Sequence, residues 1–513
     1  MRNLASAAML VAALCAAGSA ENITLTIYHT SDIHGWIMSR AAVWNKEDPK
    51  RVAGGFAALS SLVRATRGQK LLFDSGDWFQ GTPEGALSRG QSVVDLFNAA
   101  GFDAVLVGNH DFDYGQERLR ELVTALKMPA LGANIRDAKT HARVAWLSPP
   151  LIKKISGVRV GIFGLTYPDM KSMAFAKNIE GLEFTRAVDE ARLAVEELRK
   201  KGATVVIALT HLGFESPEMG QFEGDQTLAR EVPGIDVIMG GHTHKFIKEP
   251  PRVNGALITE PGIGLTAVDK VTLEIDPKTK RAVSSKGELV NLWIDRTGED
   301  PGILKTVRAD QAEADRVFSM VIATAAETLD RSRDSESAMG DWFTDCVRAW
   351  SGADIGFTNG ASIRGGIPVG PVTLRTIYNI MPYDNRMVKL TMTGAQIQET
   401  IDHGAGLGWE MLQESGAEFS YNRGRPEGRR ISKLEIGGKT VDPTASYTLA
   451  TNDFIVKGGE SFTSFSRAKQ EFSDELVRDV IRRCAEKDRL IKAPPRGRMI
   501  SLEDNGGTEK RAR

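Results

Sequence analysis

The sequence is poor in cysteine and nearly neutral, and both features limit the kind of protein it can be. Only three of its 513 residues are cysteines, and no CxxC pair occurs, so a cysteine-ligated zinc site is not supported. The formal net charge is −1, so the protein lacks the positive electrostatic potential that would hold a nucleic-acid backbone. A small anionic substrate in a local pocket remains compatible with that charge.

Long apolar runs are confined to the first twenty residues. Arg2 precedes the run "LASAAMLVAALCAAGSA", which ends in small residues and predicts a signal peptide, residues 1–20, cleaved after Ala20. The run is too short for a transmembrane anchor. Lipidation at Cys15 is disfavoured because the large Leu14 precedes it. No later segment resembles a membrane span or a lipid-anchor signal. We therefore expect a periplasmic or secreted protein without a stable membrane anchor.

Two cysteines, Cys346 and Cys484, remain after cleavage of the signal peptide. An exported protein meets an oxidising compartment, in which they could form a disulfide. Two buried free thiols are an equally good reading, because sequence alone cannot show pairing.

The length of the chain favours two domains. Short β-branched runs alternate with amphipathic helical patterns in residues 21–299, which predicts an α/β domain with strands buried on both faces. Residues 300–316 are polar and helix-prone and are predicted to form a linker helix. Residues 317–502 mix helices and strands in a second domain. The polar tail, residues 503–513, is expected to be disordered.

Five predicted strands of the first domain end in polar side chains. Loops beyond the carboxyl ends of strands form the ligand crevice of an open α/β sheet, so these side chains should meet at one rim. Six of the eight histidines lie in or beside these segments. The segments are "TIYHTSDIHG", "LLFDSGDWFQG", "AVLVGNHDFD", "VVIALTHLG" and "VIMGGHTHK".

The residue types at this rim suit two divalent cations. Asp and His bind zinc, manganese or cobalt, and a carboxylate can bridge two ions. Each motif alone has a simpler explanation, such as an exposed turn or a hydrogen-bonded histidine, and only the conjunction indicates a metal site. His29 is interpreted as a structural residue at a strand end. His141 and His403 lie outside the pattern.

The order of these motifs resembles that of the calcineurin-like metallophosphoesterases. Together with the second domain, "HTSDIHG", "SGDWFQGT", "GNHDFDYG", "THLG" and "GGHTH" resemble the exported 5'-nucleotidase and UDP-sugar hydrolase family over nearly the whole mature chain. The resemblance implies a four-layer α/β/β/α sandwich, followed by a mixed α/β domain that carries the nucleotide pocket.

The resemblance also implies roles for the polar residues at the strand ends. One metal ion would be held by Asp32, His34 and His244, and the other by Asn109, His211 and His242. Asp77 would bridge the two ions. His110 would contact the phosphoryl group and Asp113 would orient it in a His–Asp dyad. Asp111 is interpreted as a polar loop residue.

The substrate residues are expected in the second domain, on the same resemblance. Arginine binds phosphate with two charge-assisted hydrogen bonds, and aromatic rings stack on any base. Arg331 is close enough to Arg333 to confuse that assignment, and a surface salt bridge or core packing is the simpler alternative for each arginine or ring. The expected substrate-binding residues are Arg333, Asn359, Arg364, Tyr383, Phe454 and Glu460.

The segment "GGESF" departs from the family pattern. Relatives usually read "GGDGF", so Glu460 replaces the Asp that would bind the ribose hydroxyls and Ser461 replaces a glycine. The longer side chain leaves the sugar preference open.

The sequence therefore predicts an exported enzyme that hydrolyses nucleoside 5'-phosphates to nucleoside and phosphate. Attack by a metal-bound hydroxide is expected, with two ions of Mn, Zn or Co. Alternatives on the same scaffold are a 2',3'-cyclic-nucleotide phosphodiesterase and a UDP-sugar hydrolase. A thiosulfohydrolase would break the "GNHD" motif, which is intact, and a non-catalytic binding protein would have lost ligands. The oligomeric state stays open.

Overall fold

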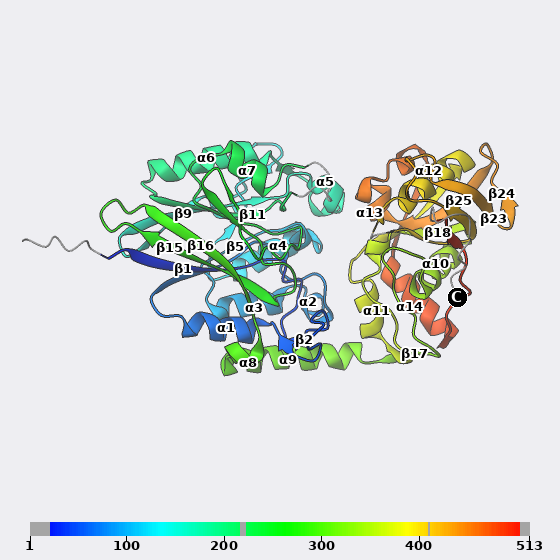
Figure 1. The fold of residues 1–513 in the computed structure, drawn as a ribbon, viewed down its shortest axis with the longest axis horizontal. Helices are drawn as coiled ribbons and strands as arrows, with labels where there is room; N and C mark the ends of the chain where they lie inside the picture. The colour runs from blue at the N-terminus through cyan, green and yellow to red at the C-terminus, as the bar shows by residue number, and fades with distance from the viewer. Residues whose placement is uncertain (1–20, 216–221, 409–410, 503–513) are drawn as a thin grey trace, which may run out of the picture.

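The computed structural model describes residues 21–215, 222–408 and 411–502. Two domains lie along the long axis of the molecule, and helix α9 (Pro301–Phe318) runs along one side from the first to the second (Figure 1). The predicted signal peptide and the predicted disordered tail lie outside the described residues. The domain boundaries themselves stay predictions.

The first domain contains a six-stranded mixed sheet. Strands β1, β4, β5 and β6 are parallel to one another, β15 pairs antiparallel with β1, and β16 pairs antiparallel with β15. In spatial order the strands are β16 (Ala282–Asn291), β15 (Ala267–Ile275), β1 (Ile23–Thr30), β4 (Gln69–Asp74), β5 (Ala104–Leu106) and β6 (Ala130–Leu131).

A second six-stranded sheet faces the first one. Its central strands β9, β11, β12 and β14 are parallel, and β8 and β13 close its edges in antiparallel pairs. In spatial order the strands are β13 (Arg252–Val253), β14 (Ala256–Thr259), β12 (Val237–Met239), β11 (Val205–His211), β9 (Val158–Thr166) and β8 (Leu151–Ile155).

Three apolar layers hold these sheets and their helices together. Leu25, Ile27 and Phe73 of the first sheet pack with Val160 and Ile207 of the second. The other face of each sheet packs against helices, so the layers are α/β/β/α, as predicted. The covering helices are α1 (Phe56–Ala65), α3 (Gln91–Ala100) and α4 (Gly115–Ala125) on the first sheet, with α6 (Ala187–Lys200) and α7 (Asp225–Glu231) on the second.

Helix α9 occupies the position of the predicted linker helix, but it is docked on the first domain. Asp300 caps it by accepting hydrogen bonds from the backbone N–H groups of Gly302 and Ile303. Ile303 and Val307 are buried in the core beneath α1 and α3. The first half of α9 therefore belongs to the packing of the first domain.

The second domain is built around a five-stranded sheet flanked by helices. Helices α10 (Ala338–Ser351) and α14 (Val477–Asp488) contact each other, and α12 (Gly394–Ala405) packs in a separate apolar cluster. The strands, in order, are β21 (Gln413–Ser415), β18 (Ile355–Thr358), β25 (Ser446–Asn452), β20 (Arg386–Thr393) and β26 (Lys469–Leu476).

A disulfide joins Cys346 on α10 to Cys484 on α14. The sequence left open whether these cysteines pair or stay free, and in the structure they are paired. The bond links segments 138 residues apart. Among the described residues, no helix has the length and apolar character needed to cross a bilayer.

Candidate dinuclear metal centre and substrate cavity

The loops at the strand ends bring all seven predicted metal ligands together. Four of the ligands lie in the loops after β1, β4 and β5 of the first sheet. The other three come from the second sheet, one at the end of β11 and two in the loop after β12. The site therefore lies where the carboxyl ends of two parallel sheet segments meet, and not on the rim of a single sheet.

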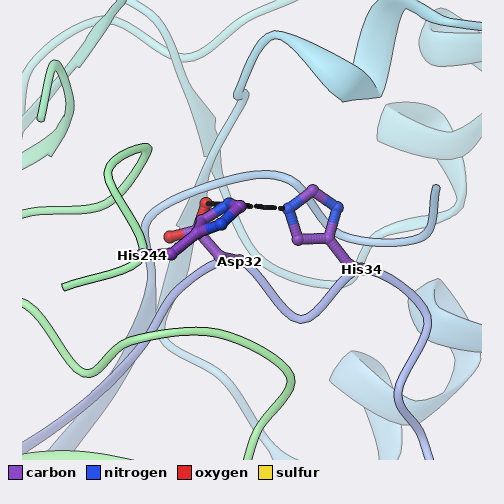
Figure 2. A group of neighbouring side chains, drawn as sticks. All are labelled: Asp32, His34 and His244. Atoms are coloured by element: carbon purple, nitrogen blue, oxygen red, sulfur yellow. Dashed lines mark hydrogen bonds and ion pairs between the residues drawn. The ribbon is translucent and has the colours of Figure 1, made fainter. Parts of the chain in front are cut away.

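One cluster of ligand atoms is formed by Asp32, His34 and His244 (Figure 2). The Nε2 atoms of His34 and His244 lie 3.1 Å apart. The Oδ1 atom of Asp32 lies 3.4 Å from Nε2 of His244 and 3.9 Å from Nε2 of His34. These atoms point at one another from two different loops and suit one cation.

A second cluster adjoins the first. The Oδ1 atom of Asn109 lies 3.1 Å from Nε2 of His211 and 3.0 Å from Nδ1 of His242. Asp77 stands between the clusters, because its Oδ2 atom is 3.2 Å from Nε2 of His211 and 3.7 Å from Nε2 of His34. This is the position that a bridging carboxylate requires.

The backbone at the site is held in a conformation that side chains rarely adopt. Only a few per cent of residues other than glycine have a positive φ, and such strain gathers at functional sites. In this site, five of the seven predicted ligands have a positive φ. They are Asp32 (φ 52°), His34 (φ 49°), Asp77 (φ 60°), His242 (φ 83°) and His244 (φ 56°).

Hydrogen bonds behind the ligands aim their free atoms. The Nδ1–H of His34 donates to the carbonyl oxygen of Gln80 at 2.6 Å, and that of His211 donates to the carbonyl oxygen of Ser75 at 2.7 Å. These bonds leave Nε2 of each ring as the ligand atom. The Oδ2 atom of Asp32 accepts from the Ser31 hydroxyl at 2.5 Å, which leaves Oδ1 toward the cluster.

The electrostatics of the site favour neutral imidazoles at His34 and His242 beside charged carboxylates. Burial lowers the pKa of His34 to about 3 and the pKa of His242 to about 3. At His211 burial also opposes protonation, but the carboxylate of Asp77 raises the pKa to about 10. Burial opposes ionisation of Asp32, but its hydrogen bond with His244 lowers its pKa to about 2. Neutral nitrogen and anionic oxygen donors are what a divalent cation needs.

Glycine is required at one point where the loops approach closely. A Cβ atom on Gly108 would lie 2.3 Å from Oδ1 of Asp77. The same Oδ1 atom accepts a hydrogen bond from the backbone N–H of His110 at 2.8 Å. The glycine before Asn109 thus lets the "GNHD" loop rest directly on Asp77.

Asp111 has a larger role than the polar loop residue expected from the sequence. Its carboxylate is buried and accepts three backbone hydrogen bonds, from Gly108 at 2.7 Å, Trp78 at 2.9 Å and Asp77 at 3.0 Å. It therefore ties the loop after β4 to the loop after β5. The interpretation failed because the sequence does not show that this side chain turns inward.

His29 is buried in a polar network behind the ligands, in agreement with a structural role. Its Nδ1 lies 2.9 Å from Oδ2 of Asp269 and its Nε2 lies 2.8 Å from Oγ of Ser75. The Ser75 hydroxyl donates to the carbonyl oxygen of Met239. This Asp–His–Ser set has the composition of a nucleophilic triad, but its members are fully buried and unreachable by a substrate. It supports Ser75, which in turn orients His211.

The predicted catalytic pair is in contact. Nδ1 of His110 donates to Oδ2 of Asp113 at 2.9 Å. His110 and Asp113 both line a cavity of about 240 Å³ between the two domains. Four of the predicted ligands line the same cavity: Asp77, Asn109, His242 and His244.

Five of the six predicted substrate residues line that cavity from the other domain. They are Asn359, Arg364, Tyr383, Phe454 and Glu460. Arg333 is exposed and is not among the lining residues, so the structure does not bring it to the cavity. Its neighbour Arg331 donates to the carbonyl oxygen of Gly360, beside Asn359.

Tyr383 reaches across the domain interface. Its ring stacks on the imidazole of His110, with centroids 5.4 Å apart and planes at 24°. The guanidinium carbon of Arg364 lies 5.8 Å from the centroid of the same tyrosine ring. The two domains therefore contribute adjoining walls of one cavity.

Glu460 makes a contact that the sequence did not indicate. Its Oε1 atom accepts a hydrogen bond from Nδ2 of Asn359 at 2.5 Å, and Oδ1 of Asn359 accepts one from Ser362. Glu460 (φ 53°) and Ser461 (φ 63°) both have left-handed backbones, where glycine is favoured. Two of the predicted substrate residues are thus bonded to each other at the cavity wall.

Nine further residues line the cavity without having been predicted, and they include Phe175, Asn385, Asp453 and Lys457. Phe175 comes from the first domain, after helix α5 (Met170–Met173), and the other three come from the second. Asn385 is the last residue of the motif "MPYDN" and Asp453 lies within "TNDF", so the motifs themselves were an available signal. Nothing in the sequence marks Phe175.

Comparison with known proteins agrees with this architecture. The calcineurin-like phosphoesterase profile matches residues 25–246, and the profile of the 5'-nucleotidase C-terminal domain matches residues 321–467. Protein UshA of Yersinia enterocolitica is 24% identical, with 93% of this chain and 94% of that protein aligned. The crystal structure of a 5'-nucleotidase precursor from Thermus thermophilus has a TM-score of 0.78 at 25% identity and covers 94% of this chain and 99% of that one.

Some relatives are much longer. The endonuclease YhcR of Bacillus subtilis is 27% identical over 462 residues, which cover 85% of this chain but only 37% of YhcR. The chain thus spans little more than a third of that relative.

Fold, ligand cluster and sequence together define the class. Residues 25–246 match the calcineurin-like phosphoesterases and carry the ligand cluster that such a domain needs. They are followed by residues 321–467, which match the 5'-nucleotidase C-terminal domain, so the chain has the domain order of the two-domain 5'-nucleotidases to which it is similar.

Proposed function

We propose that the protein is an exported two-metal nucleotidase that hydrolyses nucleoside 5'-phosphates to nucleoside and phosphate. The observation that carries this proposal is the shared cavity. Its first-domain wall holds the predicted metal ligands and His110, and its second-domain wall holds Arg364, Tyr383 and Phe454. A substrate with a phosphate at one end and a flat base at the other matches both walls.

The donor set fits two divalent cations. Asp32, His34 and His244 would hold one ion, and Asn109, His211 and His242 the other, with Asp77 shared between them. When bound, two such ions lower the pKa of water and screen the charge of phosphate oxygens. Mn, Zn and Co all suit these nitrogen and oxygen donors.

The residues of the chain bind and orient the substrate and donate a proton to it. Arg364 pairs with phosphate oxygens, and Tyr383 and Phe454 stack on the base. His110 presents Nε2 to the phosphoryl group as a charge stabiliser and proton donor, while Asp113 fixes its ring. Such a group contributes about 10²–10⁴ to the rate.

A panel of substrates tests the function. After chelation and reloading with Mn, Zn or Co, phosphate release is measured from AMP, UMP, UDP-glucose, 2',3'-cyclic AMP and an aryl phosphate. We expect no activity without metal and the highest kcat/KM with nucleoside 5'-monophosphates. Phe454→Ala should raise KM for AMP and UMP alike, whereas Phe472→Ala, an exposed phenylalanine of the same domain, should not.

Three other results would redirect or overturn the assignment. A preference for 2',3'-cyclic AMP or UDP-glucose would favour a phosphodiesterase or a UDP-sugar hydrolase. Equal kcat/KM for AMP in wild type and Phe454→Ala would remove the nucleotide pocket. Full activity of the metal-free protein would overturn the dinuclear centre.

Export is supported by the apolar run before Ala20 and by the disulfide between Cys346 and Cys484, a bond that persists in oxidising compartments. N-terminal sequencing of the protein from fractionated cells should begin at Glu21 in the exported fraction. Retention of residues 1–20 in a cytosolic protein would contradict export.

A further inference from the structure

Lys457 stands beside the predicted base-stacking ring. It follows helix α13 (Asp453–Val456) directly and lies three residues after Phe454, which places both side chains on neighbouring positions of one turn. Both residues line the cavity. The ammonium group is thus next to the edge of any ring that stacks on Phe454.

The direction of this ammonium group is fixed by a buried carboxylate. Nζ of Lys457 lies 3.0 Å from Oδ2 of Asp453, which is 2% exposed. On another side, Nζ lies 4.6 Å from the centroid of the Phe175 ring, contributed by the first domain. An ammonium group has three donors, and the ion pair uses one. The Lys457 side chain is 32% exposed, so a further donor can face the cavity.

Asn385 supplies the complementary acceptor on the same wall. Its Nδ2 donates to Oδ1 of Asp453 at 3.3 Å, which leaves its Oδ1 as the free end of the amide. Asp453 therefore orients both neighbours, with N–H groups from Lys457 and a carbonyl oxygen from Asn385 at the cavity.

This pairing of donor and acceptor distinguishes between bases. Hypoxanthine, guanine and uracil present a carbonyl oxygen next to a ring N–H, which matches an ammonium donor and an amide acceptor. Adenine presents an amino group beside an unprotonated ring nitrogen, the opposite pattern. A polar group left unpaired on binding costs affinity, so the mismatch is penalised.

We propose that Lys457 is a specificity-determining residue that makes the cavity prefer nucleotides whose base carries a carbonyl group next to a ring N–H, over adenine nucleotides. This inference rests on the proposed nucleotidase function and adds the class of base to it.

Inosine and adenosine 5'-monophosphates give the sharpest test because their bases differ only in the group on C6 and in the proton on the adjacent ring nitrogen. We expect the wild-type protein to have about tenfold higher kcat/KM for IMP than for AMP, the lower range for a hydrogen bond to a charged donor at a partly exposed site. Lys457→Met should bring the ratio close to one, mainly through a higher KM for IMP with kcat unchanged. Lys457→Arg keeps a charged donor and should retain a preference.

Lys433→Met is the matched control, because Lys433 pairs with Glu435 on an exposed strand of the same domain. Its IMP to AMP ratio should equal that of wild type. Thermal unfolding of each variant separates loss of recognition from loss of fold.

The outcomes separate the inference from the function on which it rests. Turnover of both nucleotides with the same ratio in wild type and Lys457→Met, or a wild-type preference for AMP, overturns the role of Lys457 and leaves the nucleotidase standing. No turnover of any nucleotide, with turnover of an aryl phosphate, overturns both.

Discussion

Asp113 holds His110 through Nδ1, across 2.9 Å, and directs the other ring nitrogen into the interdomain cavity. Burial opposes protonation of this imidazole, but the carboxylates of Asp113 and Asp77 raise the pKa of His110 well above its usual range. These carboxylates therefore favour the cationic form of the ring. A cation in this position stabilises a phosphoryl group during ester hydrolysis.

We expect substitutions in the His–Asp pair to lower kcat, and more strongly at the histidine than at the aspartate. His110→Ala should lower kcat by about 10²–10⁴ with metal content unchanged, because a transition-state contact is removed but no ligand is. Asp113→Asn should lower kcat by about 10–100-fold, because the ring remains but loses its orienting partner. Steady-state kinetics and metal analysis measure both effects.

His141→Ala is a suitable control, since His141 is 71% exposed and pairs with Glu183 away from the cavity. It should match wild type. Loss of metal from His110→Ala would instead place His110 among the ligands.

We expect substitution of Asp111 to lower metal affinity, although Asp111 is not itself a predicted ligand. Asp111→Ala leaves the N–H groups of Gly108, Trp78 and Asp77 without their buried acceptor, which costs about 1–3 kcal/mol for each group left unpaired. Metal affinity should fall by about 10–100-fold, as for other residues that orient ligands. Asp111→Asn keeps one acceptor oxygen, so its metal affinity should lie between those of wild type and Asp111→Ala. Isothermal titration with Mn²⁺ checks the order, and equal affinities in all three proteins would contradict it.

The sequence was sufficient for the strands and the ligand loops because both are local signals. Short β-branched runs such as residues 205–211 end directly in a ligand, so the pattern marks the strand and its chemistry together. The same holds for the "GNHD" segment. The polar, helix-prone composition also predicted the helix at residues 300–316, although not that Ile303 and Val307 bury it against the first domain.

The contacts that the sequence did not reveal depend on chain segments that meet only in the fold. The bond between Glu460 and Asn359 joins residues 101 positions apart. The contact of Phe175 with Lys457 crosses the domain interface. Asp111 was misread because the inward turn of its side chain follows from the loop conformation and not from residue type. Patterns in one segment carry no information on such partners.

The disulfide predicts a large contribution to stability. It closes a loop of 138 residues, and cross-links of that span restrict the unfolded chain by about 2–5 kcal/mol. Cys346→Ala with Cys484→Ala should lower the free energy of unfolding by that amount while kcat for a small aryl phosphate stays near wild type. Urea unfolding with and without reductant measures it. A wild-type protein whose stability is insensitive to reductant would show that the cysteines do not pair in solution.

Asp341 predicts a change of stability with pH. It lies in the first turn of α10, is fully buried, and neither carboxylate oxygen has a hydrogen-bond partner within the described part of the chain. Burial, reinforced by Glu336, raises the pKa of Asp341 from 3.8 to about 7. The folded protein thus binds a proton that the unfolded chain has released between these values, and stability falls as pH rises through that range.

Asp341→Asn removes this titration. Relative to wild type, its free energy of unfolding should rise by about 4 kcal/mol between pH 4 and pH 8, since one pKa unit corresponds to about 1.4 kcal/mol. Denaturant unfolding at several pH values gives the difference curve. Glu418→Gln, at an exposed position of the same domain, should give a flat curve. A flat curve for Asp341→Asn as well would mean that Asp341 ionises in the folded protein as readily as in the unfolded chain, through water or a cation that reaches it.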